Sequence, residues 1–415
     1  MQKKTTFSSF PTPELIEAHG YIAETHQVWT KDDYCLRVHR VISPNDRVSS
    51  NNDVLTDTDT SATDNNADDQ SVPLNCNQDV RISCTGLKLP ILLNHGLLSS
   101  SADFVLLGPR RALAYLLCDN GFDVWLTNCR GNTYSKHHKF YSRKDKEFWN
   151  FSFHDIGCYD LPATIDYILE KTGHSKLYFI GHSQGAASFY IMGSEKPEYI
   201  AKIKGMISLA PAAFVGNQKS LLLKYISYWR NILEWGFDAC NMYQVFPRFN
   251  KWQTNILSTF LHKAPYVVTK SIYSTWFYFL AGYGSNQFEK TMAPLIFAHF
   301  PAGASSKQLT HYNQLIYSKS FQKYDHGAKK NLTLYGSTEP PKYNLERLTV
   351  PIAIFYSHND RFLDYADVET LVSKLPNVVQ IEAISYKMFN HVDFLWGRDA
   401  KELLYDKILS ALKNF

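Results

Sequence analysis

The strongest constraint on the fold of this chain is an alternation of short apolar runs with helical segments that begins at residue 89. Parallel strands need a long crossover between them, so this alternation predicts an α/β fold with a mostly parallel sheet and helices on both faces. The expected strands are the apolar runs 89–94, 122–127, 177–180, 206–210, 352–356 and 379–384. The expected helices are 112–118, 160–171, 186–194 and a C-terminal helix from about residue 400.

The alternation stops between residues 213 and 340, where aromatic-rich segments such as 221–235 and 272–280 take its place. We interpret this region as a mostly helical cap inserted between two strands of the sheet. Aromatic residues make up 14% of the chain, which fits either a large aromatic core or an apolar substrate cavity.

Two further strands are expected near the N-terminus, at 27–31 and 34–41, joined by a turn at Asp32 and Asp33. The stretch 45–70 is rich in Asp, Asn, Ser and Thr and is too polar to offset its ordering entropy, so it predicts a flexible loop. The expected organisation is an N-terminal segment with the first strands (1–44), the polar loop (45–72), the first part of the core (73–212), the helical cap (213–340) and the second part of the core (341–415).

Charge, hydropathy and cysteine spacing give no indication of a nucleic-acid partner, a transmembrane helix or a cysteine metal site. The formal net charge of +4 over 415 residues gives no reason to expect a nucleic-acid partner. The sequence contains no run of about 18 apolar residues, so no transmembrane helix is expected, and residues 1–10 lack the apolar stretch of a secretory signal peptide. The cysteine count is odd and no metal-binding spacing occurs, so we expect mostly buried single thiols, with Cys76 and Cys84 close enough to close a small loop.

The motif Gly181-His182-Ser183-Gln184-Gly185 follows the expected strand 177–180 and precedes the expected helix 186–194. A sharp turn between strand and helix lifts a serine hydroxyl out of the sheet, and glycines on both sides avoid collisions with the crowded backbone. Ser183 is therefore the candidate nucleophile, which needs a base within reach to become reactive.

Two candidate partners follow later strands, in the order that such a fold requires. Asp360 comes after the strand 352–356, with Asp364 as an alternative acid and Asp367 as the expected cap of the next helix. His391 is the only histidine after the last strand, whereas His358 lies beside the candidate acid and is the weaker candidate base. We expect His391 to accept the Ser183 proton and Asp360 to fix its tautomer.

The oxyanion formed by attack on a carbonyl needs two backbone donors. The N–H of Gln184 opens the helix after the nucleophile. The second donor is expected from the segment Asn94-His95-Gly96-Leu97, where Gly96 lets the backbone turn so that the N–H of Leu97 enters the site. We expect His95 to be structural, since one catalytic histidine suffices.

Several of these segments resemble the acid lipase family, which includes the gastric and lysosomal acid lipases. The resemblance extends from about Pro13 to the C-terminus. The similar segments include His95-Gly96-Leu97-Leu98-Ser99, Asn128-Cys129-Arg130-Gly131-Asn132, Gly181-His182-Ser183-Gln184-Gly185, Pro301-Ala302-Gly303 and Asn390-His391-Val392-Asp393-Phe394-Leu395-Trp396.

The resemblance implies an α/β-hydrolase fold with a helical cap, the triad Ser183, Asp360 and His391, and oxyanion donors at Leu97 and Gln184. It also implies a lipid ester substrate, transient contact with a lipid surface, and a secreted or lysosomal location. Two glycosylation sequons begin at Asn150 and Asn331, the first in an aromatic stretch that we interpret as a candidate for burial.

The chain departs from the family pattern in its extra polar stretch at 45–70, in the lack of a visible signal peptide, and in Cys240, which stands alone in the cap. The function expected first is hydrolysis of long-chain acyl esters, either triacylglycerols or steryl esters, without metal or cofactor. A small-ester hydrolase or acyltransferase on the same fold is the second hypothesis, and a non-catalytic lipid-binding module is the third.

Overall fold

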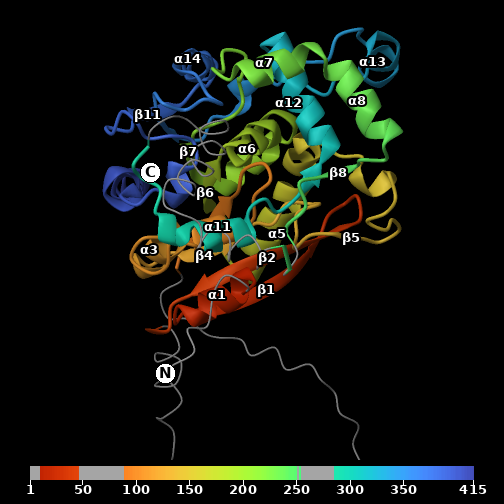
Figure 1. Ribbon diagram of the computed structural model, residues 1–415. Coiled ribbons are helices and arrows are strands. Elements are labelled where there is room, and N and C mark those ends of the chain that lie inside the picture. The colour runs from red at the N-terminus through yellow and green to blue at the C-terminus, as the bar shows by residue number, and fades with distance from the viewer. Residues whose placement is uncertain (1–9, 46–87, 250–251, 254–284) are drawn as a thin grey trace, which may run out of the picture.

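A computed structural model describes residues 10–45, 88–249, 252–253 and 285–415. Its centre is a mixed sheet with the strand order β1-β2-β4-β3-β6-β7-β10-β11, to which β5 is added beside β2 (Figure 1). The strands are β1 Ile22–Trp29, β2 Tyr34–Ile42, β3 Pro90–Asn94, β4 Asp123–Leu126, β5 His137–His138, β6 Leu177–His182, β7 Ile203–Leu209, β10 Ile352–Tyr356 and β11 Val378–Ala383. A separate two-stranded sheet pairs β8 Gln244–Val245 with β9 Ala304–Ser305.

The neighbouring strands β4, β3, β6, β7, β10 and β11 run parallel to one another. By contrast, β1 and β2 form an antiparallel pair, and β2 pairs with β4 in antiparallel orientation. The central strands β3 and β6 are buried at every residue, as expected for strands covered on both faces. This confirms the α/β-hydrolase fold class and the mostly parallel sheet predicted from the sequence.

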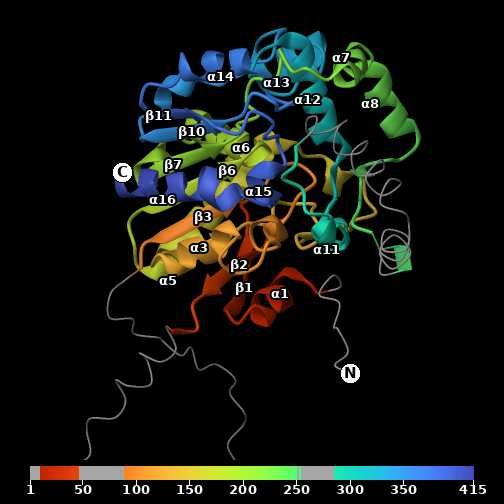
Figure 2. The same ribbon diagram turned by 60° about the vertical axis from the view of Figure 1, so that its left-hand side comes forward.

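Helices cover both faces of this sheet (Figure 2). On one face lie α3 Leu113–Asp119 and α16 Asp406–Lys413, and on the other lie α5 Leu161–Thr172 and α6 Gln184–Glu195, which contact each other. The helix α5 ends where the sequence predicts a stop, because Gly173 adopts a left-handed conformation with φ 71°. No helix among the described residues is long and apolar enough to cross a membrane.

Between β7 and β10 the described chain is mostly helical and lies over one end of the sheet (Figure 1). Its helices are α7 Leu221–Tyr228, α8 Arg230–Ala239, α11 Ala293–His299, α12 Ser306–Ser318 and α13 Ala328–Tyr335. We call this region the cap. The segment 221–235 is broken at Trp229, which ends α7 and precedes α8.

Three expectations about local structure are wrong. The first strand covers Ile22–Trp29 rather than 27–31, because Thr30 already accepts and donates the hydrogen bonds of the turn to Tyr34. Asn150 is exposed rather than buried. Asn331 is fully buried and its amide nitrogen donates to Asp325 Oδ1 at 2.7 Å, so the folded chain does not present it for glycosylation.

Cys35, Cys118, Cys129 and Cys158 are buried free thiols and Cys240 is exposed, so most of the described cysteines are buried, as predicted. The polar stretch 46–70, the pair Cys76 and Cys84, and the segment 272–280 lie outside the described residues.

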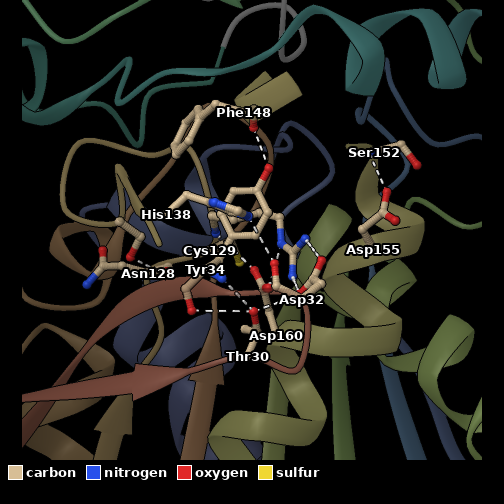
Figure 3. Close-up of polar contacts among 12 residues, drawn as sticks. Thr30, Asp32, Tyr34, Asn128, Cys129, His138, Phe148, Ser152, Asp155 and Asp160 are labelled. Carbon is tan, nitrogen blue, oxygen red and sulfur yellow. Dashed lines mark hydrogen bonds and ion pairs between the residues drawn. The ribbon is translucent and has the colours of Figure 1, made fainter. Parts of the chain in front are cut away.

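A buried ionic cluster joins the N-terminal strands to the core. The Nε of Arg130 donates to Asp160 Oδ1 at 2.7 Å, and its two Nη atoms donate to Asp32 at 2.5 and 2.9 Å. The guanidinium also lies over the ring of Tyr34, 4.1 Å from its centroid. Figure 3 shows Asp32, Tyr34 and Asp160 converging, from the β1–β2 turn, the start of β2 and the start of α5.

We expect Arg130→Met to lower the free energy of unfolding by about 3–5 kcal/mol, because it leaves a buried carboxylate without its partner. Urea denaturation followed by circular dichroism measures the change. The control Lys202→Met breaks an exposed pair with Asp166 and should cost about 1 kcal/mol or less. Equal small losses in both variants would contradict this account of Arg130.

Candidate active site

Ser183 occupies a strained turn between β6 and α6. Its backbone angles are φ 54° and ψ −117°, outside the regions that side chains normally allow. A Cβ on Gly185 would lie 2.2 Å from the carbonyl oxygen of Asn94, and one on Gly181 would lie 2.7 Å from the backbone of Ala186. Both glycines of the motif are therefore required by the close approach of β3, β6 and α6.

The structure brings Ser183, His391 and Asp360 together at the carboxyl end of the parallel strands. The Oγ of Ser183 is 2.9 Å from His391 Nε2, and His391 Nδ1 is 2.6 Å from Asp360 Oδ2. A carboxylate only accepts hydrogen bonds, so Nδ1–H is the donor to Asp360 and Nε2 is free to accept the serine hydroxyl proton. This is the arrangement of a nucleophile, a base and the acid that orients the base.

Asp360 is fully buried and its other oxygen accepts hydrogen bonds from the backbone N–H groups of Phe362 and Leu363. These bonds fix the carboxylate on the loop after β10. The alternative base His358 is exposed, with its ring against Tyr356 at a centroid distance of 5.5 Å.

Of the other two acids, Asp364 caps the helix α14 Tyr365–Val372 by accepting from Ala366 N, and its carboxylate pairs with Lys219 at 3.0 Å. The sequence prediction that Asp367 caps this helix is wrong. Asp367 already lies inside the first turn, and it accepts instead from the side-chain amide of Asn217 at 3.0 Å.

The two expected oxyanion donors lie beside the nucleophile. Gln184 is the first residue of α6, and the backbone of Gly96 is so close that a Cβ there would lie 3.3 Å from the Cβ of Ser183. Among the described residues, neither the N–H of Leu97 nor that of Gln184 donates a hydrogen bond to another protein group. Both donors are therefore available to a ligand.

His95 holds the peptide group that carries the Leu97 donor. Its Nδ1–H donates to the carbonyl oxygen of Gly96 at 2.8 Å, and its Nε2 accepts from the backbone N–H of Cys129 at 3.1 Å. In a trans peptide the N–H of Leu97 points away from that carbonyl. Burial lowers the pKa of His95 to about 4, which keeps the ring neutral and in this tautomer.

The sequence analysis did not single out two residues that hold the segment around His391. His182 Nε2–H donates to the carbonyl oxygen of His391 at 3.1 Å, and burial followed by the nearby His391 lowers the pKa of His182 well below its ordinary value. Asp393 accepts from Asn390 N at 2.8 Å and from Ser285 Oγ at 2.5 Å. Both residues lie within quoted sequence motifs, His182 in 181–185 and Asp393 in 390–396, but the sequence does not show which groups they contact, because those contacts depend on tertiary packing.

Comparisons with known proteins agree with this geometry. The family model for the alpha/beta hydrolase fold matches residues 90–397, and the model for a partial alpha/beta-hydrolase lipase region matches residues 12–108. The chain is 36% identical to Lipase 1 of Drosophila melanogaster, over 98% of this chain and 80% of that protein.

Two human proteins are also similar to the chain, each over 97% of this chain and 90% of its own length. Gastric triacylglycerol lipase is 32% identical, and lysosomal acid lipase/cholesteryl ester hydrolase is 31% identical. Among solved structures, a putative lipase from Sulfolobus solfataricus superposes with a TM-score of 0.57 at 15% identity, covering 95% of this chain and 94% of that one. That structure supports the fold alone.

We expect Gly96→Ala to slow the labelling of Ser183 by a fluorophosphonate about tenfold or more. The added Cβ would lie 3.3 Å from both Ser183 Cβ and His182 Nδ1, which displaces the peptide of the Leu97 donor, and losing one such donor costs about 3 kcal/mol. Gly236→Ala, in α8 with open space around it, is the control and should label at the wild-type rate. Wild-type labelling of Gly96→Ala would remove Leu97 from the site.

The stability of the wild type should depend on pH through Asp393, whose pKa burial raises to about 7. A raised folded-state pKa means that the contribution is fully present below the unfolded pKa of about 4 and is lost as the pH rises to 7. Asp393→Asn keeps an acceptor but cannot ionise, so relative to wild type it should gain on the order of 3 kcal/mol between pH 4 and pH 8.

Urea denaturation at the two pH values measures this difference. The exposed carboxylate variant Glu17→Gln is the control and should follow the wild-type pH dependence. If the free energy of unfolding of Asp393→Asn shows the same pH dependence as that of wild type, the buried carboxyl is not the group that titrates.

Proposed function

We propose that this chain, which belongs to the acid lipase family of α/β-hydrolases, is a lipase that hydrolyses carboxylic esters of long-chain fatty acids. The observation that carries the proposal is the continuous hydrogen-bonded relay from Ser183 through His391 to Asp360. It is supported by free backbone donors beside the nucleophile and by relatives that are named as lipases.

The proposed reaction has two halves. Ser183 Oγ attacks the acyl carbonyl carbon while its proton passes to His391 Nε2, and the N–H groups of Leu97 and Gln184 stabilise the oxyanion. Collapse breaks the bond to the alcohol, which leaves with the proton from His391, and the acyl group remains on Ser183. Water then attacks the acyl-enzyme with the same proton transfers and releases the fatty acid.

Asp360 orients the imidazole throughout and stabilises the imidazolium that forms in each half. His95 acts one step away, by holding the Gly96–Leu97 peptide from the carbonyl side. The reaction uses only these groups and water, so the proposal requires no metal ion or cofactor.

The proposed substrates are triacylglycerols and steryl esters, because the human relatives are named as a triacylglycerol lipase and as an acid lipase/cholesteryl ester hydrolase at nearly equal identity. Burial of an acyl chain contributes about 0.8 kcal/mol per methylene, so a long chain is bound mainly by apolar contacts. Parallel assays with dispersed triolein and cholesteryl oleate, at acidic and neutral pH, distinguish the two substrates. A rate that falls steadily with acyl length would favour a small-ester hydrolase instead.

Transient contact with a lipid surface is part of the proposal and is supported by the cap. Aromatic and apolar side chains on and beside α7 and α8 are strongly exposed, and the most exposed among them are Trp235 (71%) and Tyr225 (69%). We call the following residues the cap aromatic face: Tyr225, Tyr228, Trp229, Ile232, Trp235 and Met242. An apolar hollow of about 460 Å³ opens among several of them. Tryptophan and tyrosine favour the boundary between water and lipid, where one end of the ring is wet.

A secreted or lysosomal location is proposed from the same relatives, whose names place them in gastric and lysosomal settings. The sequon at Asn150 fits this location. Its side chain is exposed, and within the described part of the chain only its Oδ1 is engaged, by Lys307 Nζ at 3.0 Å, which leaves the amide nitrogen for a glycan.

Ser183→Ala is expected to reduce the hydrolysis of dispersed triolein by about 10⁴-fold or more, because it removes the nucleophile while leaving the fold. Fluorophosphonate labelling should disappear in the same variant. Ser188→Ala, which removes another buried hydroxyl from α6, is the matched control and should retain wild-type activity. Equal rates from wild type and Ser183→Ala would refute the proposed function.

A further inference from the structure

The segment 136–146, Lys-His-His-Lys-Phe-Tyr-Ser-Arg-Lys-Asp-Lys, concentrates positive charge at one place on the surface. We call it the basic loop. It contains five lysine or arginine residues and one carboxylate, a net charge of +4, which equals the formal net charge of the entire chain. The rest of the sequence is therefore balanced, and this loop carries the imbalance.

Three of the five cations of the loop are exposed and form no ion pair with any described residue, and they stand beside exposed aromatic rings. Within the part of the chain that the structure describes, Lys139, Arg143 and Lys144 form no ion pair, although all three are exposed. Phe140 is 69% exposed and Tyr141 is 43% exposed. Exposed apolar side chains rimmed by polar groups are typical of a surface that contacts a protein or a membrane.

The backbone of the loop is nevertheless held in place. His138 Nδ1 accepts from the N–H groups of Phe140 and Tyr141, and the buried Trp149 donates through Nε1 to the carbonyl oxygen of Arg143 at 2.8 Å. The carboxylate of Asp145 accepts from Ser142 N at 2.7 Å. The loop thus presents its side chains from a preformed scaffold, which lowers the entropic cost of binding.

The basic loop lies at the carboxyl end of the parallel strands, which is also the end at which Ser183 lies. β5 pairs with the beginning of β2, at Tyr34 and Cys35, whereas the later residue His39 is already opposite Leu126, the last residue of β4. The start of β2 therefore extends beyond the carboxyl end of the parallel strands, where the nucleophile lies. Figure 1 shows β5 and α8 on the same side of the molecule.

The basic loop also adjoins the cap aromatic face. Lys146 Nζ pairs with Asp238 Oδ1 of α8 at 2.9 Å, and the same ammonium lies 5.6 Å from the ring centroid of Tyr243. A cationic region and an apolar aromatic region thus meet across a single ion pair. A polynucleotide or an acidic protein would match the cations but leave the exposed tryptophans of α7 and α8 without an apolar partner.

We infer that the basic loop 136–146 docks the protein on anionic lipid surfaces, with its free cations at the headgroups and Phe140 and Tyr141 in the interfacial layer. The inference rests on the proposed lipase function, for which it supplies the kind of surface that the enzyme selects. A lipid surface offers both negative charge and apolar depth, and each surface cation strengthens such binding by about 1 kcal/mol, or about fivefold.

Vesicle binding of the full chain tests the inference without turnover. The probes are vesicles of phosphatidylcholine alone and vesicles of equal parts phosphatidylcholine and phosphatidylglycerol, with binding followed by sedimentation. We expect the triple variant Lys139→Gln, Arg143→Gln, Lys144→Gln to bind the anionic vesicles at least tenfold more weakly at low salt and the neutral vesicles as wild type does. Added salt should bring wild type close to the variant.

The matched control replaces three exposed lysines at the opposite edge of the sheet: Lys171→Gln, Lys176→Gln and Lys413→Gln. This variant loses the same charge and should bind anionic vesicles within about twofold of wild type. The double variant Phe140→Ala, Tyr141→Ala should weaken binding to both kinds of vesicle, because it removes the interfacial rings rather than charge.

Wild-type hydrolysis of a water-soluble short-chain ester by the loop variants would show that their fold and triad are intact. The inference is overturned if the loop triple variant binds anionic vesicles as wild type does, or if the control triple variant loses as much. Preferential binding to an acidic protein or a polynucleotide over anionic vesicles would also overturn it. These outcomes are independent of the Ser183→Ala assay, which decides the proposed function by itself.

Discussion

The strained backbone at Ser183 is the constraint on which the rest of the site depends. A conformation of this kind costs about 1–3 kcal/mol and persists only when the surroundings hold it. Here the N–H of Ser183 donates to Leu209 of β7, and Gly185 packs against the carbonyl of Asn94 in β3. The central strands β3, β6 and β7 therefore fix this turn, and the turn directs the hydroxyl of Ser183 toward His391. Loosening of the sheet at this point would relax the serine away from its base.

The same packing links the two sides of the reaction centre. Gly96 approaches Ser183 so closely that a Cβ there would lie 3.3 Å from the Cβ of Ser183, and His95 holds the peptide that follows it. On the other side, His182, the residue before the nucleophile, donates to the carbonyl of His391. Both of these histidines are buried and have lowered pKa values, so they remain neutral and act through fixed hydrogen bonds. Only His391 is left with an imidazole nitrogen directed at the serine hydroxyl.

The polar interior and the outer surface serve different ends. Arg130 joins the N-terminal strand pair to the core through the partly exposed carboxylate of Asp32 and the buried carboxylate of Asp160, which holds β2 in position at the carboxyl end of the parallel strands. The basic loop contains β5, which pairs with that strand, and it contacts the cap through the ion pair between Lys146 and Asp238. The exposed cations and aromatic rings of the basic loop are thus anchored to the same sheet that carries Ser183.

The sequence by itself determined the fold class, the succession of central strands and helices along the chain, and Ser183 as the candidate nucleophile, because period, turn chemistry and motif context are local properties of the chain. The Gly-x-Ser-x-Gly pattern needed only its neighbouring strand and helix to be interpreted. Only the tertiary structure decided that Asp360 rather than Asp364 meets His391, that Asp364 rather than Asp367 caps α14, and that Asn331 rather than Asn150 is buried. These choices depend on contacts between residues far apart in the chain, such as Ser285 with Asp393 or Lys146 with Asp238, and no local pattern encodes the distance between them.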